Sequence, residues 1–462
     1  MTAPRHIAVI DIGKTNAKLA LVDRVALREI AVVTQPNRVL PGPPWPHFDT
    51  EGIWAFLLAA LAHFHALHRV DAISVTTHGA CAALLTADGT LAAPVLDYEH
   101  DGPDHTAADY DALRPGFAET GSPCLAQGLN LGAQLYWQFQ ADPGLRQRVA
   151  WVVTWPQYWG HRLTGVAATD VTSLGCHTDL WNPATRGFSS LVGRLGLTGR
   201  FAPPRRPGDI LGPILPQIAA QTGLDPTTPV ACGIHDSNAS LLPHLLGRDP
   251  PFSVVSTGTW VVTMSVGGRP VRLDEGRDTL INVNALGDPV PSARFMGGRE
   301  YEKLRAGREV TPGAAAVAEA LARGVMLLPA VEPGSGPFRG HRMAWTPPDA
   351  EIGEEVRAAA LSFYLALMTA ECLAITGAAG PVVVEGPFAS NLLFRQMLAA
   401  AVGRPVVASS SRTGTSIGAA MLFGGRVEAP APLDVPEPDP QHAILRRYAE
   451  AWRVAVAAQG AD

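Results

Sequence analysis

The sequence predicts an α/β protein of two related domains, and three observations support this fold class. A chain of 462 residues, 47% of them hydrophobic, can bury enough core for about two or three domains. A strand, a glycine-containing turn and a second strand at Ile7–Asp23 recur at Ser253–Gly267, about half a chain later. Strand–turn–helix units follow in both halves, as in α/β proteins. We therefore expect one domain over residues 1–245 and a second over residues 246–462.

The first hairpin, IAVIDIGKTNAKLALVD, carries a carboxylate and several hydrogen-bond donors around a short turn. One apolar strand ends at Asp11 and a second leaves from Leu19. Glycine in the turn lets backbone N–H groups approach a ligand closely, and such groups suit phosphate. Lys14 and Lys18 add positive charge beside them. The other polar or glycine residues of the turn are Gly13, Thr15 and Asn16. An ordinary hairpin without a ligand is the alternative interpretation.

The rest of the first half alternates strands and helices. Residues 26–34 read as a third strand, and the spacing of apolar residues over 51–67 predicts a helix. A short strand at Asp71–Thr77 ends directly before His78 and Gly79. A histidine and a glycine at a strand end lie where α/β proteins bind ligands, although a lone histidine is more often structural.

A polar cluster follows at residues 97–100. Asp97 and its neighbours Tyr98, Glu99 and His100 could contact the hydroxyl groups of a small molecule. A solvated loop explains the same residues equally well.

The segment PVACGIHDSNA, residues 229–239, places a carboxylate at a strand end. The strand breaks at Gly233, and a helix begins near Ser237. Asp236 could cap this helix, which is a common role for aspartate. The same position, next to His235, would also allow the carboxylate to take a proton from an alcohol that attacks phosphorus.

The second half begins with a hairpin whose turn is rich in hydroxyl groups, Ser256 to Thr259. If the two hairpins open related domains, they would hold a polyphosphate from both sides; two unrelated hairpins are the alternative. Two strand–glycine turn–helix units follow, with turns at 386–391 and 414–418. This arrangement is expected of a nucleotide pocket at the carboxyl ends of strands.

Composition excludes several other classes of function. The net charge is −6 and there is no basic block, so neither a nucleic-acid surface nor a polybasic membrane anchor is expected. The five cysteines are scattered and never form a CxxC pair, which favours reduced thiols over disulfides or zinc. No signal peptide precedes Ile7, and no uninterrupted apolar run is long enough to span a bilayer. We expect a cytoplasmic protein.

Taken in order, these motifs resemble the FGGY family of carbohydrate kinases, in the superfamily that includes actin, hexokinase and Hsp70. DIGKTNAK resembles the first phosphate motif, GIHDSNAS the segment of the catalytic base, and STGTW the second phosphate motif. EGPFASN with GTSIGAA resembles the adenosine motif, THGA the sugar-binding turn, and HRLTG the family's LTG segment. The resemblance covers nearly the whole chain. Pro387 and Phe388 depart from the family's glycine-rich adenosine turn.

The resemblance implies two actin-like, ribonuclease H-like domains flanking a catalytic cleft. It implies that Asp236 is the general base and that Asp11 helps to hold Mg²⁺, through water. Sugar contacts would come from His78, Gly79 and His235, with Asp97 as a further candidate from the polar cluster. ATP contacts would come from Gly13, Thr15, Asn16, Lys18, Thr257, Gly258 and Thr259 at the phosphates and from Gly386 and Asn391 at the adenosine. The start of the helix is expected to lower the pKa of Asp236.

The motifs also favour one class of substrate among those of the family. The His235–Asp236 pair, followed by GTW, is similar to L-rhamnulose and L-fuculose kinases and favours a 6-deoxy-ketohexose phosphorylated at the C1 hydroxyl. A pentulose substrate stays open, as does a sugar- or nucleotide-binding protein without turnover. An Hsp70-like ATPase is a third alternative. Many relatives are homodimers, and the oligomeric state stays open here.

Overall fold

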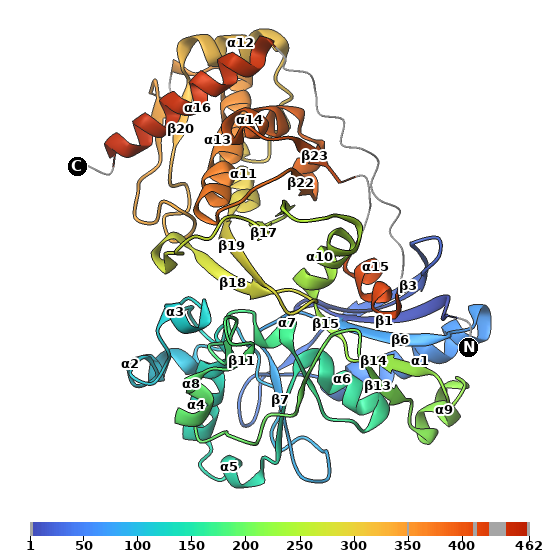
Figure 1. Ribbon diagram of the computed structural model, residues 1–462. Helices are drawn as coiled ribbons and strands as arrows, with labels where there is room; N and C mark the ends of the chain where they lie inside the picture. Colours follow the sequence, from blue (N-terminus) through green and yellow to red (C-terminus); the bar gives the residue numbers. More distant parts are fainter. Residues whose placement is uncertain (1–2, 349–350, 410–413, 425–439, 460–462) are drawn as a thin grey trace. The chain divides into compact units, whose positions relative to one another are not determined.

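The computed structural model describes residues 3–348, 351–409, 414–424 and 440–459, which form two compact units (Figure 1). Of the described residues, the first unit comprises residues 3–247, Ile281–Pro289 and residues 414–424. The second comprises Arg248–Leu280, residues 290–348 and 351–409, and the C-terminal helix. Residues 281–289 and 414–424 therefore belong to the first unit although they follow the expected division at residue 245.

The first unit is built on a seven-stranded sheet in which an antiparallel meander meets parallel strands. β1 pairs antiparallel with β2 and parallel with β6, while β15 pairs with the end of β6. The strands across the sheet are β13 (Ile210–Pro213), β14 (Pro229–Ala231), β6 (Ala72–Thr77), β1 (His6–Ile12), β2 (Asn16–Asp23) and β3 (Arg28–Pro36), with β15 (Ile234–His235) beside β6. The carboxyl ends of β1, β6 and β15 therefore lie side by side.

Helices cover both faces of this sheet. On one face Ile10 and alternate residues of β1 pack with α1 (Thr50–His68) and α6 (Trp155–Thr164). On the other face Ile7 and Val9 pack with α10 (Asp236–Gly247) and α15 (Thr415–Ala420). Because side chains alternate along a strand, Asp11 belongs to the same series as Ile7 and Val9 and points to the side of α10.

The helix α15 reaches the first sheet through small residues. A Cβ atom on Gly418 would lie 1.8 Å from the carbonyl oxygen of Ala239, so only glycine allows this approach. The Ser74 hydroxyl donates to the carbonyl of Ala419 at 2.8 Å. The sequence predicted a helix here, together with the turn at 386–391 as parts of one nucleotide pocket. In the structure α15 packs on the first unit and residues 386–391 belong to the second, and their shared role at a nucleotide stays a prediction.

The second unit repeats the opening topology of the first. β16 pairs antiparallel with β17 and parallel with β22, as β1 does with β2 and β6. The six strands across its sheet are β18 (Thr279–Val283), β19 (Pro289–Phe295), β17 (Val261–Val266), β16 (Phe252–Thr257), β22 (Val382–Glu385) and β23 (Val406–Ala408). The predicted repeat of a strand–turn–strand opening is therefore confirmed.

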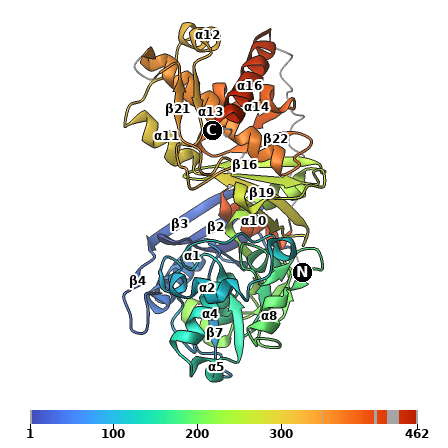
Figure 2. The same cartoon turned by 90° about the vertical axis from the view of Figure 1, so that its left-hand side faces the viewer.

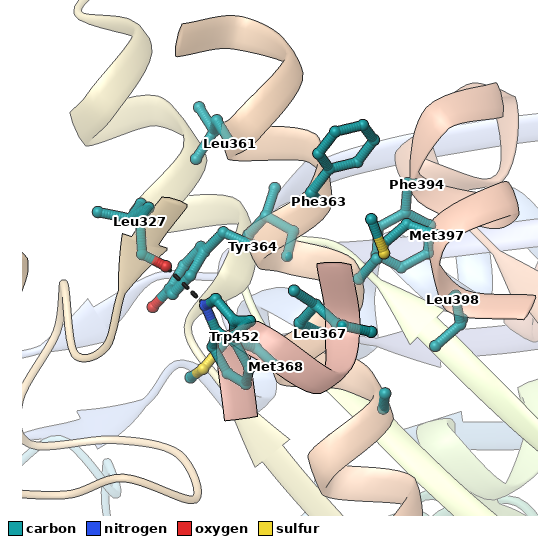
Figure 3. Packing of buried hydrophobic residues seen from close by; sticks show 14 of the residues in the cluster. Leu327, Leu361, Phe363, Tyr364, Leu367, Met368, Phe394, Met397, Leu398 and Trp452 are labelled. Atoms are coloured by element: carbon teal, nitrogen blue, oxygen red, sulfur yellow. Dashed lines mark hydrogen bonds between the residues drawn. The ribbon is translucent and has the colours of Figure 1, made fainter. Parts of the chain in front are cut away.

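The core of the second unit surrounds one long helix, α13 (Glu354–Ile375). α14 (Leu392–Val402) packs against α13, and α16 (Pro440–Gln459) packs against α14, as both overall views show (Figures 1 and 2). In the close view Nε1 of the Trp452 indole donates to the carbonyl of Leu327 at 2.7 Å (Figure 3). The hydroxyl of Tyr448 likewise donates to the carbonyl of Val325. These bonds anchor α16 on β20 (Met326–Leu328) and the residue before it.

Shorter elements complete the two units. In the first unit they are β4 (Val39–Leu40), β5 (His47–Phe48), β7 (Ala82–Leu85), α2 (Ala107–Asp111), α3 (Phe117–Thr120), α4 (Leu131–Ala141), α5 (Leu145–Arg148), β8 (Trp151–Thr154), β9 (Thr169–Asp170), α7 (Val171–Leu174), β10 (Trp181–Asn182), β11 (Gly187–Phe188), α8 (Ser190–Arg194), β12 (Pro204–Arg205) and α9 (Pro216–Thr222). In the second unit they are α11 (Gly297–Arg305), α12 (Ala314–Arg323) and β21 (Ala344–Thr346).

Two helices, α1 and α13, are long and apolar enough to cross a membrane by length and composition alone. The apolar window of α13 is 78% buried inside the structure and that of α1 39%. In α13 the charged residues Arg357 and Glu371 interrupt the apolar sequence, and its apolar residues form the core of the second unit. A buried core helix meets the same criteria as a membrane span, so the observation is weak evidence for a membrane.

Candidate functional site

The base candidate, Asp236, is the first residue of α10 and follows directly from the short strand β15. The pairing of β15 with β6 sets His235 opposite Thr77, the residue that precedes His78. Two strand ends far apart in sequence thus bring His78, His235 and Asp236 into electrostatic contact. The break at Gly233 and the helix start lie where the sequence predicted them.

One oxygen of Asp236 is anchored. Its Oδ1 accepts from the backbone N–H of Ser237 at 2.5 Å and lies 3.2 Å from Nε2 of His235. Among the described residues no contact is recorded for Oδ2, which leaves that oxygen available to a ligand. Although 37% of the side chain is exposed, burial raises the pKa of Asp236, and the Ser237 hydrogen bond only partly offsets this. The expected lowering of this pKa by the helix is therefore wrong in direction.

The two histidines of the site are neutral at physiological pH. Burial lowers the pKa of both His78 and His235 to about 4. A neutral His235 that donates from Nε2 orients the Asp236 carboxylate without competing for its proton. In His78 the Nδ1–H donates to the carbonyl of Gly79 at 2.6 Å. Its Nε2 is buried and has no hydrogen-bond partner among the described residues. A Cβ atom on Gly79 would lie 3.0 Å from Nε2 of His235, so this turn has little room for a side chain.

Asp11, the metal candidate, is ion-paired across the first hairpin. It lies opposite Lys18 in the strand register, with Nζ 3.0 Å from its Oδ2. Burial raises the pKa of Asp11, and the charge of Asp236 adds to this effect. The two carboxylates therefore repel each other, and a divalent cation near them would relieve that repulsion. No group of three metal-ligating side chains was found among the described residues, so most ligands of such a cation would have to be water or phosphate.

The turn of the first hairpin is held from outside by Asn37. The backbone N–H of Gly13 donates to the carbonyl of Asn16 at 2.9 Å, and Asn37 Nδ2 donates to the carbonyl of Gly13 at 2.8 Å. The Asn37 N–H donates to the carbonyl of Thr15. Thr15 and Asn16 themselves are exposed. The sequence did not identify Asn37, whose only signal is a proline before it in a loop.

Lys14 does not extend beside this turn as predicted. Its ammonium forms ion pairs with Asp97 and, at 3.0 Å, with Glu99. It also lies 4.9 Å from the ring centroid of Tyr98 and 5.3 Å from that of Phe48. Two carboxylates and two aromatic faces attract the ammonium more strongly than exposed backbone does. The structure thus joins Asp97 to the cluster around His78, whose ring packs 5.2 Å from that of Tyr98.

In the second unit the Thr257 hydroxyl serves the protein itself. It donates to the carbonyl of Glu385 at 2.5 Å and accepts from the N–H of Phe388 at 3.1 Å. Gly386 has a φ of +79°, and a Cβ atom there would lie 1.9 Å from the carbonyl oxygen of Thr257. The end of β16 and the turn after β22 are therefore locked together. Gly258 and Thr259 are exposed at the tip of the hairpin, where the Gly258 N–H donates to the carbonyl of Trp260 at 2.9 Å and the Thr259 carbonyl accepts from the N–H of Arg299 at 3.3 Å.

Asn391 caps a helix at the edge of a cavity. Its Oδ1 accepts from the N–H of Phe394 at 3.0 Å, and its Nδ2 donates to the Ser362 hydroxyl at 3.1 Å. Asn391 lines a cavity of about 520 Å³, a volume typical of small-molecule sites. Other lining residues include Tyr301, Arg305, Arg308, Leu361 and Leu392. The side chain of Asn391 is thus a wall of the cavity that is already hydrogen-bonded.

Two sheets with the same opening topology, each bearing a glycine-containing hairpin, define a two-domain α/β kinase fold. Residues 6–243 match the profile of the "FGGY family of carbohydrate kinases, N-terminal domain". Residues 249–431 match the "Carbohydrate kinase FGGY, C-terminal domain". The chain belongs to the FGGY family of carbohydrate kinases, enzymes that phosphorylate hydroxyl groups of sugars and related compounds with ATP.

Individual relatives have modest sequence identity to this chain. An L-fuculokinase of Salmonella typhi is 27% identical over 274 residues, and that of Escherichia coli K12 is 26% identical over 271 residues. These alignments cover only 57% and 56% of either chain. A solved carbohydrate kinase from Novosphingobium aromaticivorans is 38% identical, with a TM-score of 0.88 over 99% of both chains. A ligand-bound xylulose kinase from Lactobacillus acidophilus, 16% identical with a TM-score of 0.78 over 99% of both chains, shares the fold.

Proposed function

We propose that this protein transfers the γ-phosphoryl group of ATP to a hydroxyl of a ketose, with Asp236 as the general base. The observation that carries the proposal is the geometry of this carboxylate. Oδ1 is held by Ser237 and His235, and Oδ2 is left for the acceptor hydroxyl. The raised pKa makes Asp236 a better proton acceptor than an ordinary aspartate.

In this mechanism the acceptor hydroxyl donates to Oδ2 of Asp236 while its oxygen approaches the γ-phosphorus. Neutral His235 keeps the carboxylate in one orientation, which matters because phosphoryl transfer depends mainly on positioning. Further acceptor hydroxyls would be held by His78, Gly79 and Asp97. An acceptor hydroxyl that reached the unpaired Nε2 of His78 would give it the hydrogen bond that it lacks.

For the nucleotide we propose phosphate contacts from the turns of the two hairpins. Gly13, Thr15, Asn16 and Lys18 would meet phosphate oxygens from the first, and Gly258 and Thr259 from the second. Thr257 would act through its backbone, because its hydroxyl is already bonded. The cavity at Asn391 is proposed for the adenosine. Mg²⁺, which neutralises phosphate charge in such reactions, would be held near Asp11 through water.

A 6-deoxy-ketohexose phosphorylated at C1 is the proposed acceptor. The similarity to two L-fuculokinases supports it, together with the His235–Asp236 pair. A pentulose is the second candidate, because xylulose kinases share the fold over the whole chain. A binding protein without turnover is less well supported, since it needs neither a base nor a metal carboxylate.

The test is ATP consumption by the purified protein with L-fuculose, L-rhamnulose, D-xylulose and D-ribulose. We expect Asp236→Asn to lower turnover with the best acceptor by at least about a thousandfold, because the amide cannot accept the proton. Ketose binding by calorimetry should stay within about threefold, because Asn preserves Oδ1. Near-normal turnover of Asp236→Asn would refute the assignment of the base. Absence of turnover with every ketose would refute the acceptor class.

A further inference from the structure

The chain uses lysine very sparingly. Of its 36 basic residues only three are lysines, Lys14, Lys18 and Lys303, and the others are arginines. Two of the three stand in the first hairpin, where one turn separates them. In a chain that otherwise takes arginine for positive charge, two lysines at one turn indicate a need for the compact ammonium group rather than the broad guanidinium. Lys18 is accounted for by its pair with Asp11, whereas Lys14 is not used by the proposed mechanism.

Lys14 reaches across the first unit into the cluster around His78. Its side chain is 20% exposed and connects the first hairpin to the loop that carries Asp97. The ammonium contributes to the electrostatic environment of His78, as do His235 and Asp236. A small molecule that contacts Asp236 and His78 would therefore come within reach of Lys14 and Asp97.

The two groups retain hydrogen-bonding capacity in this position. An ammonium has three N–H donors, and among the described residues the hydrogen-bond acceptors of Lys14 are the carboxylates of Asp97 and Glu99, beside its contacts with the rings of Tyr98 and Phe48. Asp97 uses Oδ1 for Lys14 and for the N–H of Glu99, and no contact is recorded for its Oδ2 among the described residues. One donor and one acceptor side by side match a hydroxyl group, which both donates and accepts.

We propose that Lys14 and Asp97 form a pair that binds one acceptor hydroxyl other than the hydroxyl that is phosphorylated, and that this pair selects among ketoses. The inference rests on the proposed function and names the pair of side chains that recognises the acceptor. A buried ion pair built for a hydroxyl rejects an acceptor that lacks it or points it elsewhere, because its charges are then left without that partner. Glu99, whose side chain is 57% exposed, supports Lys14 from the outside.

The test compares the wild type with Lys14→Met, which keeps the apolar stem on the rings of Tyr98 and Phe48 and removes the charge. KM and kcat are measured with L-fuculose, L-tagatose, L-rhamnulose, D-xylulose and D-ribulose, and the affinity for each ketose is measured by calorimetry without ATP. We expect KM and Kd to rise about tenfold to a hundredfold for acceptors that present the hydroxyl and less than about threefold for those that do not. The kcat should change much less than KM.

Matched variants separate binding from a structural link between two loops. Asp97→Asn should raise KM and Kd for the same ketoses as Lys14→Met, whereas Lys303→Met, which removes an ammonium from α11 in the second unit, should stay within about twofold of the wild type. An equal rise in KM and Kd for every ketose would mean that Lys14 only joins the loops, and it would overturn the proposal. Unchanged Kd in Lys14→Met, or no ketose binding to the wild type, would also overturn it. A wild type that binds ketoses with this selectivity but transfers no phosphate would refute the proposed kinase reaction alone.

Discussion

Glu300 is a fully buried carboxyl in the first turn of α11, and the proposed reaction does not use it. Its Oε1 accepts from the N–H of Glu332 at 3.1 Å, and its Oε2 accepts from the hydroxyl of Tyr364 at 3.0 Å. Burial raises the pKa of Glu300 to about 7. The hydrogen bonds from the Glu332 N–H and the Tyr364 hydroxyl lower this pKa, the charge of Glu332 raises it, and the charge of Lys303 lowers it. At neutral pH the second unit therefore contains a carboxyl group that is close to its point of ionisation.

This residue makes stability depend on pH. Between pH 4.5 and about 7 the folded Glu300 keeps a proton that the unfolded chain has lost, so the free energy of unfolding falls as pH rises through this window. The loss amounts to about 3 kcal/mol at most. Glu300→Gln should match the wild type near pH 5 and be more stable near pH 8 in denaturant titrations. Glu302→Gln, an exposed neighbour, should keep the wild-type slope, and a steep slope retained in Glu300→Gln would contradict this account.

At the residue scale, the sequence predicted the location of the site residues, but not the hydrogen bonds and ion pairs that their side chains form. The position of Asp236 at a strand end, beside His235, could be predicted because a strand, a glycine and a helix start follow one another in the sequence. The hydrogen bonds of the Thr257 hydroxyl and the ion pair of Lys14 with Asp97 could not be predicted. Both depend on partners more than 80 residues away in the sequence. The pKa of Asp236 was misjudged for the same reason, since burial by distant segments outweighs the local helix.

At the scale of elements, the four-residue helix α7 holds the strand that carries the base. Asp170 caps α7 through the N–H groups of Thr172 at 2.8 Å and Ser173 at 3.2 Å. The Thr172 hydroxyl donates to Asp170 and accepts from the backbone N–H of His235 at 3.0 Å. The cap, the helix and β15 thus form one buried chain of hydrogen bonds that ends next to Asp236.

Removal of this hydroxyl should impair turnover more than binding. Thr172→Val keeps the shape of the side chain but frees β15, and we expect kcat to fall about tenfold to a hundredfold while KM for the ketose changes less than about threefold. Thr172→Ser should restore kcat to within about twofold. Thr222→Val removes a comparable buried hydroxyl, bonded to the Ile218 carbonyl in α9, and should leave kcat unchanged. Equal losses in the two valine variants would assign Thr172 a purely structural role.

Most elements were predictable because their apolar spacing and their glycine stops are local signals. The hairpins at β1–β2 and β16–β17 were found from the sequence, and so was the helix that follows His235. The position of α15 was not, because a glycine-led helix after a strand looks the same whether it covers the first sheet or the second. The contact of Gly418 with Ala239, which fixes the position of α15, joins residues 179 positions apart in the sequence.

At the scale of the whole molecule, two separate cores predict two unfolding events. Leu57 is fully buried in the first unit and Leu398 in the second. In calorimetry, Leu57→Ala should lower only the transition that a bound ketose raises, and Leu398→Ala only the one that adenosine raises. Each truncation should cost about 2–5 kcal/mol, and a ligand at a hundred times its Kd should add about 2.7 kcal/mol. One transition that both ligands and both variants shift equally would show a single cooperative unit instead.

The position of α15 also constrains how the chain can fold while it is being synthesised. Residues 1–247 leave the ribosome long before residues 415–420 have been translated. Until then Ile7, Val9 and Leu242 lack one of the helices that cover them in the finished protein. The apolar face of the nascent first unit must therefore stay exposed, or be covered by a chaperone, until the second unit has been synthesised. A recombinant fragment cut at the domain boundary near residue 245 would keep that face exposed permanently, which predicts aggregation rather than an isolated sugar-binding domain.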